Sequence, residues 1–135
     1  MKDLTKIKVA DIMSRWVVTV GINDKIEDVL RTFVEFKVHA VVVIGPGGEF
    51  MGVISHSDII EALNKLGPRF FDLEVEDIMC PKPYTIEGEA SVKEAAAKMI
   101  NNKVHRLLVL SQQPAKRVPV GIVSATDIIR VVAEQ

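Results

Sequence analysis

Two kinds of apolar pattern alternate along the chain. Short runs of Val, Ile and Leu predict buried strands, and segments in which apolar residues recur every three or four positions predict amphipathic helices. The strands are predicted over residues 17–20, 40–44, 51–55, 84–86, 106–110 and 118–124. Two helices are predicted to follow the pairs Asp24–Glu27 and Ser91–Glu94, which are expected to cap them, and two more span about 57–66 and 126–133. Each half of the chain therefore reads strand, helix, strand, strand, helix.

The two halves are copies of one unit. The sequence Val-Ala-Asp-Ile-Met at 9–13 recurs as Val-Glu-Asp-Ile-Met at 75–79, and Lys-Val-His at 37–39 recurs at 103–105. Beyond a loop of different length, Gly-Val-Ile-Ser at 52–55 recurs as Gly-Ile-Val-Ser at 121–124. Length differences of this kind concentrate in surface turns. We therefore predict a first unit at 1–66, a connector at 67–74 and a second unit at 75–135.

The order of elements predicts an α/β (α+β) fold made of two tandem β-α-β-β-α units. A unit this small buries too little apolar surface to be stable alone. We therefore expect the two units to pack sheet to sheet with pseudo-twofold symmetry.

Composition excludes several classes of function. Of the 135 residues, 48% are hydrophobic, the net charge is −1, and no cluster of Lys and Arg marks a nucleic-acid-binding face. The longest apolar run, 40–44, is too short to cross a membrane, and the N-terminal residues lack the apolar stretch of a signal peptide. The single cysteine, Cys80, cannot form an intrachain disulfide, which favours a reducing compartment. We expect a cytoplasmic protein that binds neither nucleic acid nor a membrane.

The sequence offers no recognisable catalytic or metal-binding motif. The glycine-rich stretch at 45–48 links two predicted strands and is followed by Phe50 where a dinucleotide loop needs glycine. Cys80 has no histidine at a motif spacing and is expected to be a small buried residue. The histidines at 39, 56 and 105 lack the spacing of a zinc site. We expect no enzyme activity and no metal.

The same polar pair stands twice at the junction of a strand and the following helix. Ser55 and Asp58 hold this place in the first unit, and Ser124 and Asp127 hold it in the second. Helix capping alone explains such residues. However, Asp58 is predicted to lie within the first turn of its helix, where a carboxylate can accept both hydroxyls of a ribose diol. Capping and ligand binding both remain open at this point.

A histidine begins the middle strand of each unit. A lone histidine at such a position, as at His39 or His105, is usually a partly buried surface residue, but a pseudo-twofold axis would bring the two toward one central cleft. Arg106 follows the second histidine, and Ala40 takes its place in the first unit. The planar guanidinium suits phosphate. The three cationic side chains therefore indicate a phosphate-binding patch.

These residues are the ones by which CBS domains are recognised, and the chain resembles a tandem CBS pair, or Bateman module. The resemblance covers 9–65 and 75–134 and is carried by Asp-Ile-Met twice, Gly-Val-Ile-Ser-His-Ser-Asp at 52–58 and Gly-Ile-Val-Ser-Ala-Thr-Asp at 121–127. In addition, Val-His-Arg-Leu-Leu-Val at 104–109 is similar to the phosphate-contacting segment in the regulatory gamma subunits of AMP-activated protein kinase.

The resemblance implies two quasi-equivalent clefts that hold AMP, ADP, ATP or S-adenosylmethionine. It assigns the ribose to Asp58 and Asp127, and it has each cleft take its adenine pocket from the opposite copy. The set built on Asp127 is Met13, Val18, Val38, His39, Arg106, Ser124, Thr126 and Asp127. The set built on Asp58 is Ser55, Ser57, Asp58, Met79, Tyr84, Val104 and His105. Because Ala40 replaces Arg106 in the first copy, the two clefts are expected to differ in affinity.

The resulting hypothesis is a regulatory sensor of adenosine nucleotides, present as a homodimer and acting on an unidentified partner protein. It requires no cofactor beyond the regulatory ligand. The alternatives are an S-adenosylmethionine sensor and a structural dimerisation or docking module whose clefts stay empty. In the structural alternative, Trp16, Leu66, Phe70 and Phe71 mark the partner surface, although apolar linker residues more often cover the seam between repeats.

Overall fold

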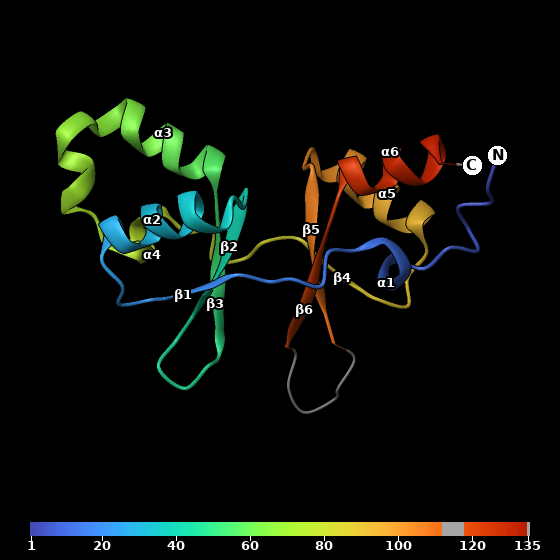
Figure 1. Cartoon of the computed structure of the whole chain (residues 1–135), viewed down its shortest axis with the longest axis horizontal. Coiled ribbons are helices and arrows are strands. Elements are labelled where there is room, and N and C mark those ends of the chain that lie inside the picture. The colour runs from blue at the N-terminus through green and yellow to red at the C-terminus, as the bar shows by residue number, and fades with distance from the viewer. Residues whose placement is uncertain (112–117, 135) are drawn as a thin grey trace. The chain divides into compact units, whose positions relative to one another are not determined.

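The computed structural model describes residues 1–111 and 118–134, and it contains two small three-stranded sheets (Figure 1). The first sheet holds β1 (Thr19–Gly21), β2 (Ala40–Ile44) and β3 (Phe50–Ser55). The second holds β4 (Thr85–Glu87), β5 (Arg106–Leu110) and β6 (Pro119–Ser124). Apart from Ser111 and Val118, the loop that lengthens the second repeat lies outside the described residues. The predicted strand order is confirmed, with bounds shifted by one or two residues in β1, β3, β4 and β6.

Both sheets have the same topology and register. The outer strand runs parallel to the middle strand, and the third strand runs antiparallel to it. Ala40 pairs with Ser55 in one sheet, and Arg106 pairs with Ser124 in the other. An irregularity follows Val43 in β2, and a matching one follows Val109 in β5. The structure therefore repeats the duplication that the sequence predicts, down to individual backbone pairs.

Among the described residues, four helices of nine to eleven residues accompany the sheets, and in each unit they lie to one side of the sheet (Figure 1). They are α2 (Ile26–Phe36), α3 (His56–Leu66), α5 (Val92–Asn102) and α6 (Ala125–Ala133). Their apolar residues at helical spacing meet the buried face of the sheet. In the first sheet's unit, Val29 of α2 and Ile59 of α3 share one core with Val41, Val43 and Ile54. Amphipathic packing of this kind supplies most of the stability of helices so short.

One of the two expected helix caps is present and the other is wrong. Ser91 Oγ accepts a hydrogen bond from Glu94 N at 3.0 Å and caps α5. In contrast, Lys25 occupies the N-cap position of α2 and makes no side-chain cap. The Asp24 carboxylate instead accepts a hydrogen bond from Gly21 N at 2.8 Å. The Asp24 carboxylate therefore belongs to the turn before α2 and not to its cap.

Two four-residue helices and a 3-10 turn were not expected from the sequence pattern. The repeated Val-x-Asp-Ile segments form α1 (Val9–Ile12) and α4 (Val75–Ile78), and the predicted connector folds as a 3-10 helix, η1 (Gly67–Asp72). Within η1, Phe70 is completely buried and belongs to the core, whereas Phe71 remains half exposed. The hypothesis that Phe70 marks a partner surface is therefore wrong, because its ring is already covered by its own unit.

Each compact unit of the structure takes its short helix from the other sequence repeat. One unit is residues 18–83, and the other combines residues 1–17 with 84–135. The compact units thus divide the chain at different points from the sequence repeats. Ser14, which follows α1, exchanges two backbone hydrogen bonds with Ile122 of β6, and Cys80, which follows α4, exchanges two with Val53 of β3.

A glycine permits each of these exchanged contacts. A Cβ atom on Gly52 would lie 2.6 Å from the carbonyl oxygen of Cys80, and one on Gly121 would lie 2.7 Å from that of Ser14. These distances are shorter than non-bonded contacts allow, so the glycine of each Gly-x-x-Ser motif makes room for the crossing segment. Cys80 itself is exposed, which corrects the expectation that it is buried. Its backbone pairs with β3, but its thiol is not part of the core.

Candidate ligand-binding site

The Ser55–Asp58 pair forms a capping box at the start of α3. Ser55 is the N-cap residue, and Asp58 is the third residue of the helix. Oδ2 of Asp58 accepts hydrogen bonds from Ser55 N at 2.8 Å and from Ser55 Oγ at 2.9 Å, while Asp58 N donates to Ser55 Oγ at 3.2 Å. The carboxylate is therefore held in one orientation by a single oxygen. In the part of the chain that the structure describes, Oδ1 of Asp58 has no hydrogen-bond partner.

The Ser124–Asp127 pair repeats this geometry at the start of α6. Oδ2 of Asp127 accepts from Ser124 N at 2.8 Å and from Ser124 Oγ at 3.1 Å, and Asp127 N donates to Ser124 Oγ at 3.3 Å. The second oxygen differs, because Oδ1 of Asp127 accepts a hydrogen bond from Arg130 Nη1 at 3.1 Å. The capping interpretation is confirmed in both units. In each unit the cap uses only Oδ2, one of the two carboxylate oxygens.

Each predicted histidine lies beside the serine of its own unit. The carbonyl oxygen of His39 accepts a hydrogen bond from His56 N, the first residue of α3, and the carbonyl of His105 accepts from Ala125 N of α6, both at 2.8 Å. Both imidazoles are exposed. The start of the middle strand and the start of the last helix are thereby fixed together. A helix N-terminus carries positive potential, which favours an anionic group beside these imidazoles.

The structure adds His56, which the sequence pattern did not assign to the site, as the neighbour of His39. The ring of His56 lies next to that of His39, with the ring centroids 5.0 Å apart and the planes tilted by 41°. In the other unit Ala125 takes this position. One unit thus carries a pair of imidazoles, and the other carries a histidine followed by Arg106. In this region the second repeat is offset from the first by 69 residues, so residue 56 aligns with residue 125. The change from histidine to alanine in that alignment was the only sign of this difference in the sequence.

The remaining predicted residues are divided between the compact units. Met79 lies in the unit of Asp58, where its sulfur comes 3.0 Å from the place of a Cβ on Gly52, and Met13 lies in the unit of Asp127 beside Gly121. The unit of residues 18–83 holds Val18, Val38, His39, Ser55, Ser57, Asp58 and Met79. The other unit holds Met13, Tyr84, Val104, His105, Arg106, Ser124, Thr126 and Asp127. Val18 is buried, whereas Tyr84 is half exposed.

A hollow of about 320 Å³ lies beside Asp58. Its lining comes from α3 and α4 and from Leu73, which precedes α4, and it includes Glu61, Lys65 and Asp77 as well as apolar side chains. Among residues 1–111 and 118–134, no three or more His, Cys, Asp or Glu side chains gather as a metal site would require. Nor does any helix of these residues have the length and apolar character needed to span a membrane.

The duplicated α+β units and their repeated Ser–Asp pairs define a tandem domain pair. The CBS domain family matches residues 9–65 and 75–134, and the chain belongs to this family. An uncharacterized protein of Methanocaldococcus jannaschii is 28% identical, over 90% of this chain and 88% of its own length.

Two solved structures of CBS proteins carry adenosine compounds. CBSX2 in complex with AMP has a TM-score of 0.76 and 25% identity, covering 95% of this chain and 97% of that chain. The CBS domain pair of protein MJ0100, in complex with 5′-methylthioadenosine and S-adenosyl-L-methionine, has a TM-score of 0.80 and 24% identity, covering 94% and 96%. Both share the fold of this chain.

Proposed function

We propose that this chain is a regulatory module that binds an adenosine nucleotide (AMP, ADP or ATP) and has no catalytic activity of its own. The observation that carries the proposal is the repeated Ser–Asp pair. In each pair the serine holds one carboxylate oxygen, which fixes the orientation of the carboxylate. A carboxylate oxygen has two lone pairs. Oδ1 of Asp58 can therefore accept both hydroxyls of a ribose without disturbing the helix cap.

The comparisons support the ligand class. CBSX2 holds AMP, and the MJ0100 pair holds two adenosine compounds without a phosphate chain. Adenosine is common to all three. The cationic groups near the Ser–Asp pairs, His39 with His56 and His105 with Arg106, favour a ligand that also carries phosphate. We therefore place AMP, ADP and ATP ahead of S-adenosylmethionine, which remains the alternative ligand.

The two residue sets predicted from the sequence stand as our proposal for the sites. In this proposal Asp58 and Asp127 bind ribose, the apolar residues enclose the base, and the cationic residues bind phosphate. The two sites are not equivalent. Asp127 already accepts a hydrogen bond from Arg130, whereas Oδ1 of Asp58 lacks such a partner among the described residues. Adenosine is therefore expected to bind more tightly at the Asp58 site, before any phosphate contact is counted.

Regulation in this proposal follows from differential binding. A ligand shifts a conformational equilibrium only by the difference between its affinities for the two states. We propose that the module works in the cytoplasm as a homodimer and passes this shift to a partner protein. We propose no catalytic activity because the chain matches CBS domains over nearly its whole length.

Titration calorimetry with AMP tests the proposal. The wild-type chain is expected to show two binding steps, and Asp58→Asn and Asp127→Asn are each expected to remove one. In the asparagine variants the amide oxygen still accepts the serine hydrogen bonds, while the NH₂ group stands where Oδ1 accepted the ribose. Glu94→Gln is the matched control, because Glu94 is also the third residue of a capped helix but belongs to neither set. Absence of heat with AMP, ADP and ATP contradicts the proposal.

A structural module with empty sites is the second candidate. It is favoured by the capping boxes, which explain Ser55, Asp58, Ser124 and Asp127 without any ligand. Thermal denaturation separates the two candidates, since a ligand that binds only the native state raises the melting temperature with concentration. A melting temperature that stays constant up to millimolar nucleotide and S-adenosylmethionine supports the structural role.

A further inference from the structure

The imidazoles of His39 and His56 are held as neighbours by the backbone beneath them. His39 directly precedes β2, His56 is the first residue of α3, and the carbonyl oxygen of His39 accepts a hydrogen bond from His56 N at 2.8 Å. The ring centroids are 5.0 Å apart, and both side chains are exposed. A strand and a helix therefore fix the two anchor points, and solvent reaches both rings. Sites on such rigid elements hold a ligand more precisely than sites on loops.

The separation of the two rings is compatible with one metal ion shared between them. A zinc–imidazole bond is about 2.1 Å long and the ring centroid lies about 1.1 Å behind the nitrogen, so each centroid is about 3.2 Å from the ion. At a tetrahedral angle of about 109°, two such centroids are about 5.2 Å apart. The observed 5.0 Å agrees with this value. Contact between two rings also allows it, so a second observation is needed.

The hydroxyl of Ser57 supplies this observation. It lies 3.3 Å from Nδ1 of His56, at hydrogen-bond distance. Histidines that bind a metal nearly always donate their other ring N–H to an oxygen, which fixes the tautomer and orients the ring. In the tautomer in which Nδ1–H donates to Ser57 Oγ, Nε2 is the nitrogen that takes the ion. The ion replaces the proton or other partner that this nitrogen has in its absence.

The charges around the pair tolerate a cation. The N-terminus of α3 carries a positive potential equivalent to about half an elementary charge, which disfavours a metal ion. The carboxylate of Asp58 brings a full negative charge into the same first turn and outweighs it. Lys37, two residues before His39, is exposed, so water and salt screen its charge. The imidazoles add no charge of their own, because they are neutral when they bind a metal.

We propose that His39 and His56 together bind one late first-row transition-metal ion, such as Zn²⁺ or Cu²⁺. Imidazole suits these ions, whereas Mg²⁺ and Ca²⁺ prefer oxygen ligands. Among residues 1–111 and 118–134, no third His, Cys, Asp or Glu is grouped with the pair. Water therefore completes the coordination, and the site is an open one whose ion exchanges and is not required for folding. The inference does not rest on the proposed function, because the ion needs no nucleotide.

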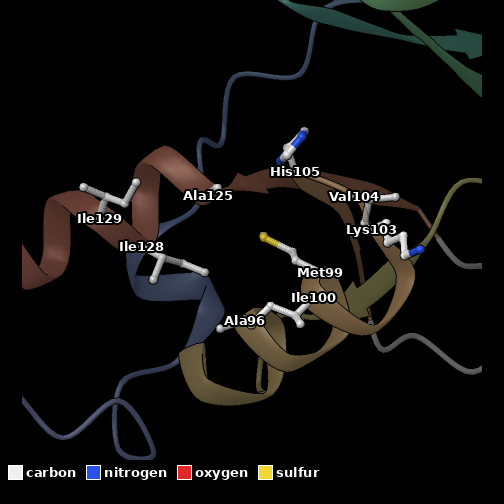
Figure 2. A pocket seen from close by; sticks show the side chains of 9 residues that line it. All are labelled: Ala96, Met99, Ile100, Lys103, Val104, His105, Ala125, Ile128 and Ile129. Atoms are coloured by element: carbon white, nitrogen blue, oxygen red, sulfur yellow. The ribbon is translucent and has the colours of Figure 1, made fainter.

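The other unit lacks the pair and provides an internal comparison. Ala125 takes the place of His56 and lies next to His105 at the start of α6, where both line a hollow of about 480 Å³ (Figure 2). The backbone is the same, because Ala125 N donates to the carbonyl oxygen of His105 at 2.8 Å. A single imidazole binds these ions more weakly than two that act together. The chain is therefore expected to take up one ion, in the unit of residues 18–83.

Titration calorimetry of the metal-free, untagged full chain with ZnCl₂, in the absence of nucleotide, measures the site. The wild type is expected to bind one Zn²⁺ per chain. His39→Gln and His56→Ala are each expected to weaken binding at least tenfold, because losing a ligand costs no less than losing an outer partner, which costs roughly ten- to a hundredfold. Cys80→Ser is the control, since the exposed thiol is the competing ligand, and its binding is expected to match the wild type.

Three results of this titration overturn the inference. They are the absence of saturable Zn²⁺ binding below millimolar concentration, binding that persists unchanged in both histidine variants, and binding that is lost in Cys80→Ser. Electron paramagnetic resonance of the wild type loaded with one equivalent of Cu²⁺ counts the ligands directly. Two imidazole nitrogens are expected on the ion, and a single nitrogen overturns the inference.

Ala125→His transfers the histidine pair to the other unit. This variant is expected to bind two Zn²⁺ per chain, the second more weakly, because Arg106 follows His105 where Ala40 follows His39. A variant that is folded by its melting curve and still binds one ion shows that this backbone geometry does not make the site, and it overturns the inference. A chain that binds Zn²⁺ at the pair but no adenosine compound contradicts the proposed function alone.

Discussion

Arg130 donates a hydrogen bond from Nη1 to Oδ1 of Asp127 at 3.1 Å, across one turn of α6. At the equivalent position of α3 stands Glu61, which pairs with Lys65 at 3.5 Å and not with Asp58. The Asp127 side chain is only 13% exposed, so its pairing is less screened than that of a surface pair. This single difference makes the two otherwise matching Ser–Asp pairs chemically distinct.

Replacement of Arg130 by Gln is expected to strengthen adenosine binding at the Asp127 site. The substitution removes the charged donor that competes with ribose for Oδ1, and exchange of a charge-assisted hydrogen bond for a weaker one corresponds to a gain of roughly threefold to tenfold. Titration calorimetry with adenosine measures the effect, and Glu61→Gln serves as the control in the other unit. Loss of the binding step would show that Arg130 itself holds the ligand.

Lys37→Gly and Lys103→Gly are expected to stabilise the protein. Both lysines end a helix in the left-handed region, with φ of 53° and 55°. In this region a residue with a Cβ atom is less stable than glycine by about 1 kcal/mol for steric reasons. Part of this gain is offset because glycine loses more backbone entropy on folding. We therefore expect a gain of up to about 1 kcal/mol in the free energy of unfolding for each substitution.

Urea denaturation measures this change, and Asn101→Gly, two residues earlier within α5, is the comparison. Asn101 has helical geometry, so glycine there is expected to reduce the free energy of unfolding by about 0.5 kcal/mol. If glycine lowers the free energy of unfolding equally at positions 101 and 103, the left-handed conformation of Lys103 is not strained.

Gly121→Ala and Gly52→Ala are expected to destabilise the protein by about 1–3 kcal/mol, because an added methyl group forces the crossing segment to move. The segment is backbone, the carbonyl of Ser14 or Cys80, and it cannot rotate away as a side chain does. Gly47→Ala is the milder control, since its Cβ would meet only the flexible carboxylate of Glu49. Denaturant titration gives the free energies of unfolding. Equal destabilisation at positions 47 and 121 would show that the crossing segment is not tightly packed against Gly121.

Phe70→Ala is expected to reduce the free energy of unfolding by about 3–5 kcal/mol, as for other fully buried aromatic residues. Its ring is completely buried, and its neighbour Phe71 contacts it edge-on, with the centroids 5.4 Å apart. Phe71→Ala provides the contrast, because half of that side chain is exposed. A similar, small loss for both residues, measured by chemical denaturation, would exclude Phe70 from the core.

Local features of this fold were predictable from the sequence, and long-range ones were not. The β2 and β5 bounds agree with prediction because consecutive apolar residues fill all of β2 and all of β5 after Arg106. The Ser–Asp pairs were predictable because a residue and the third one after it meet in the first helical turn. By contrast, the four-residue α1 and α4 contain too few turns to show a period, and the crossing of Ser14 onto β6 depends on contacts more than a hundred residues apart.

The same limit applies within the candidate site. The contact of His56 with His39 joins a helix to the residue before β2, 17 positions earlier, and the pairing of Arg130 with Asp127 is one of several that a helix face allows. Asp24 shows the reverse case, because a nearby turn amide at Gly21 holds the carboxylate that the motif assigned to a cap. The residue types at the site could therefore be predicted from the sequence. The groups that compete for their hydrogen bonds and contacts could be identified only from the structure.

A crystal structure of the chain grown with AMP tests the central claim most directly. The account predicts ribose hydroxyls within hydrogen-bond distance of Oδ1 of Asp58, with the serine hydrogen bonds to Oδ2 still in place. AMP bound elsewhere, with the Asp58 and Asp127 carboxylates both facing solvent, would contradict it.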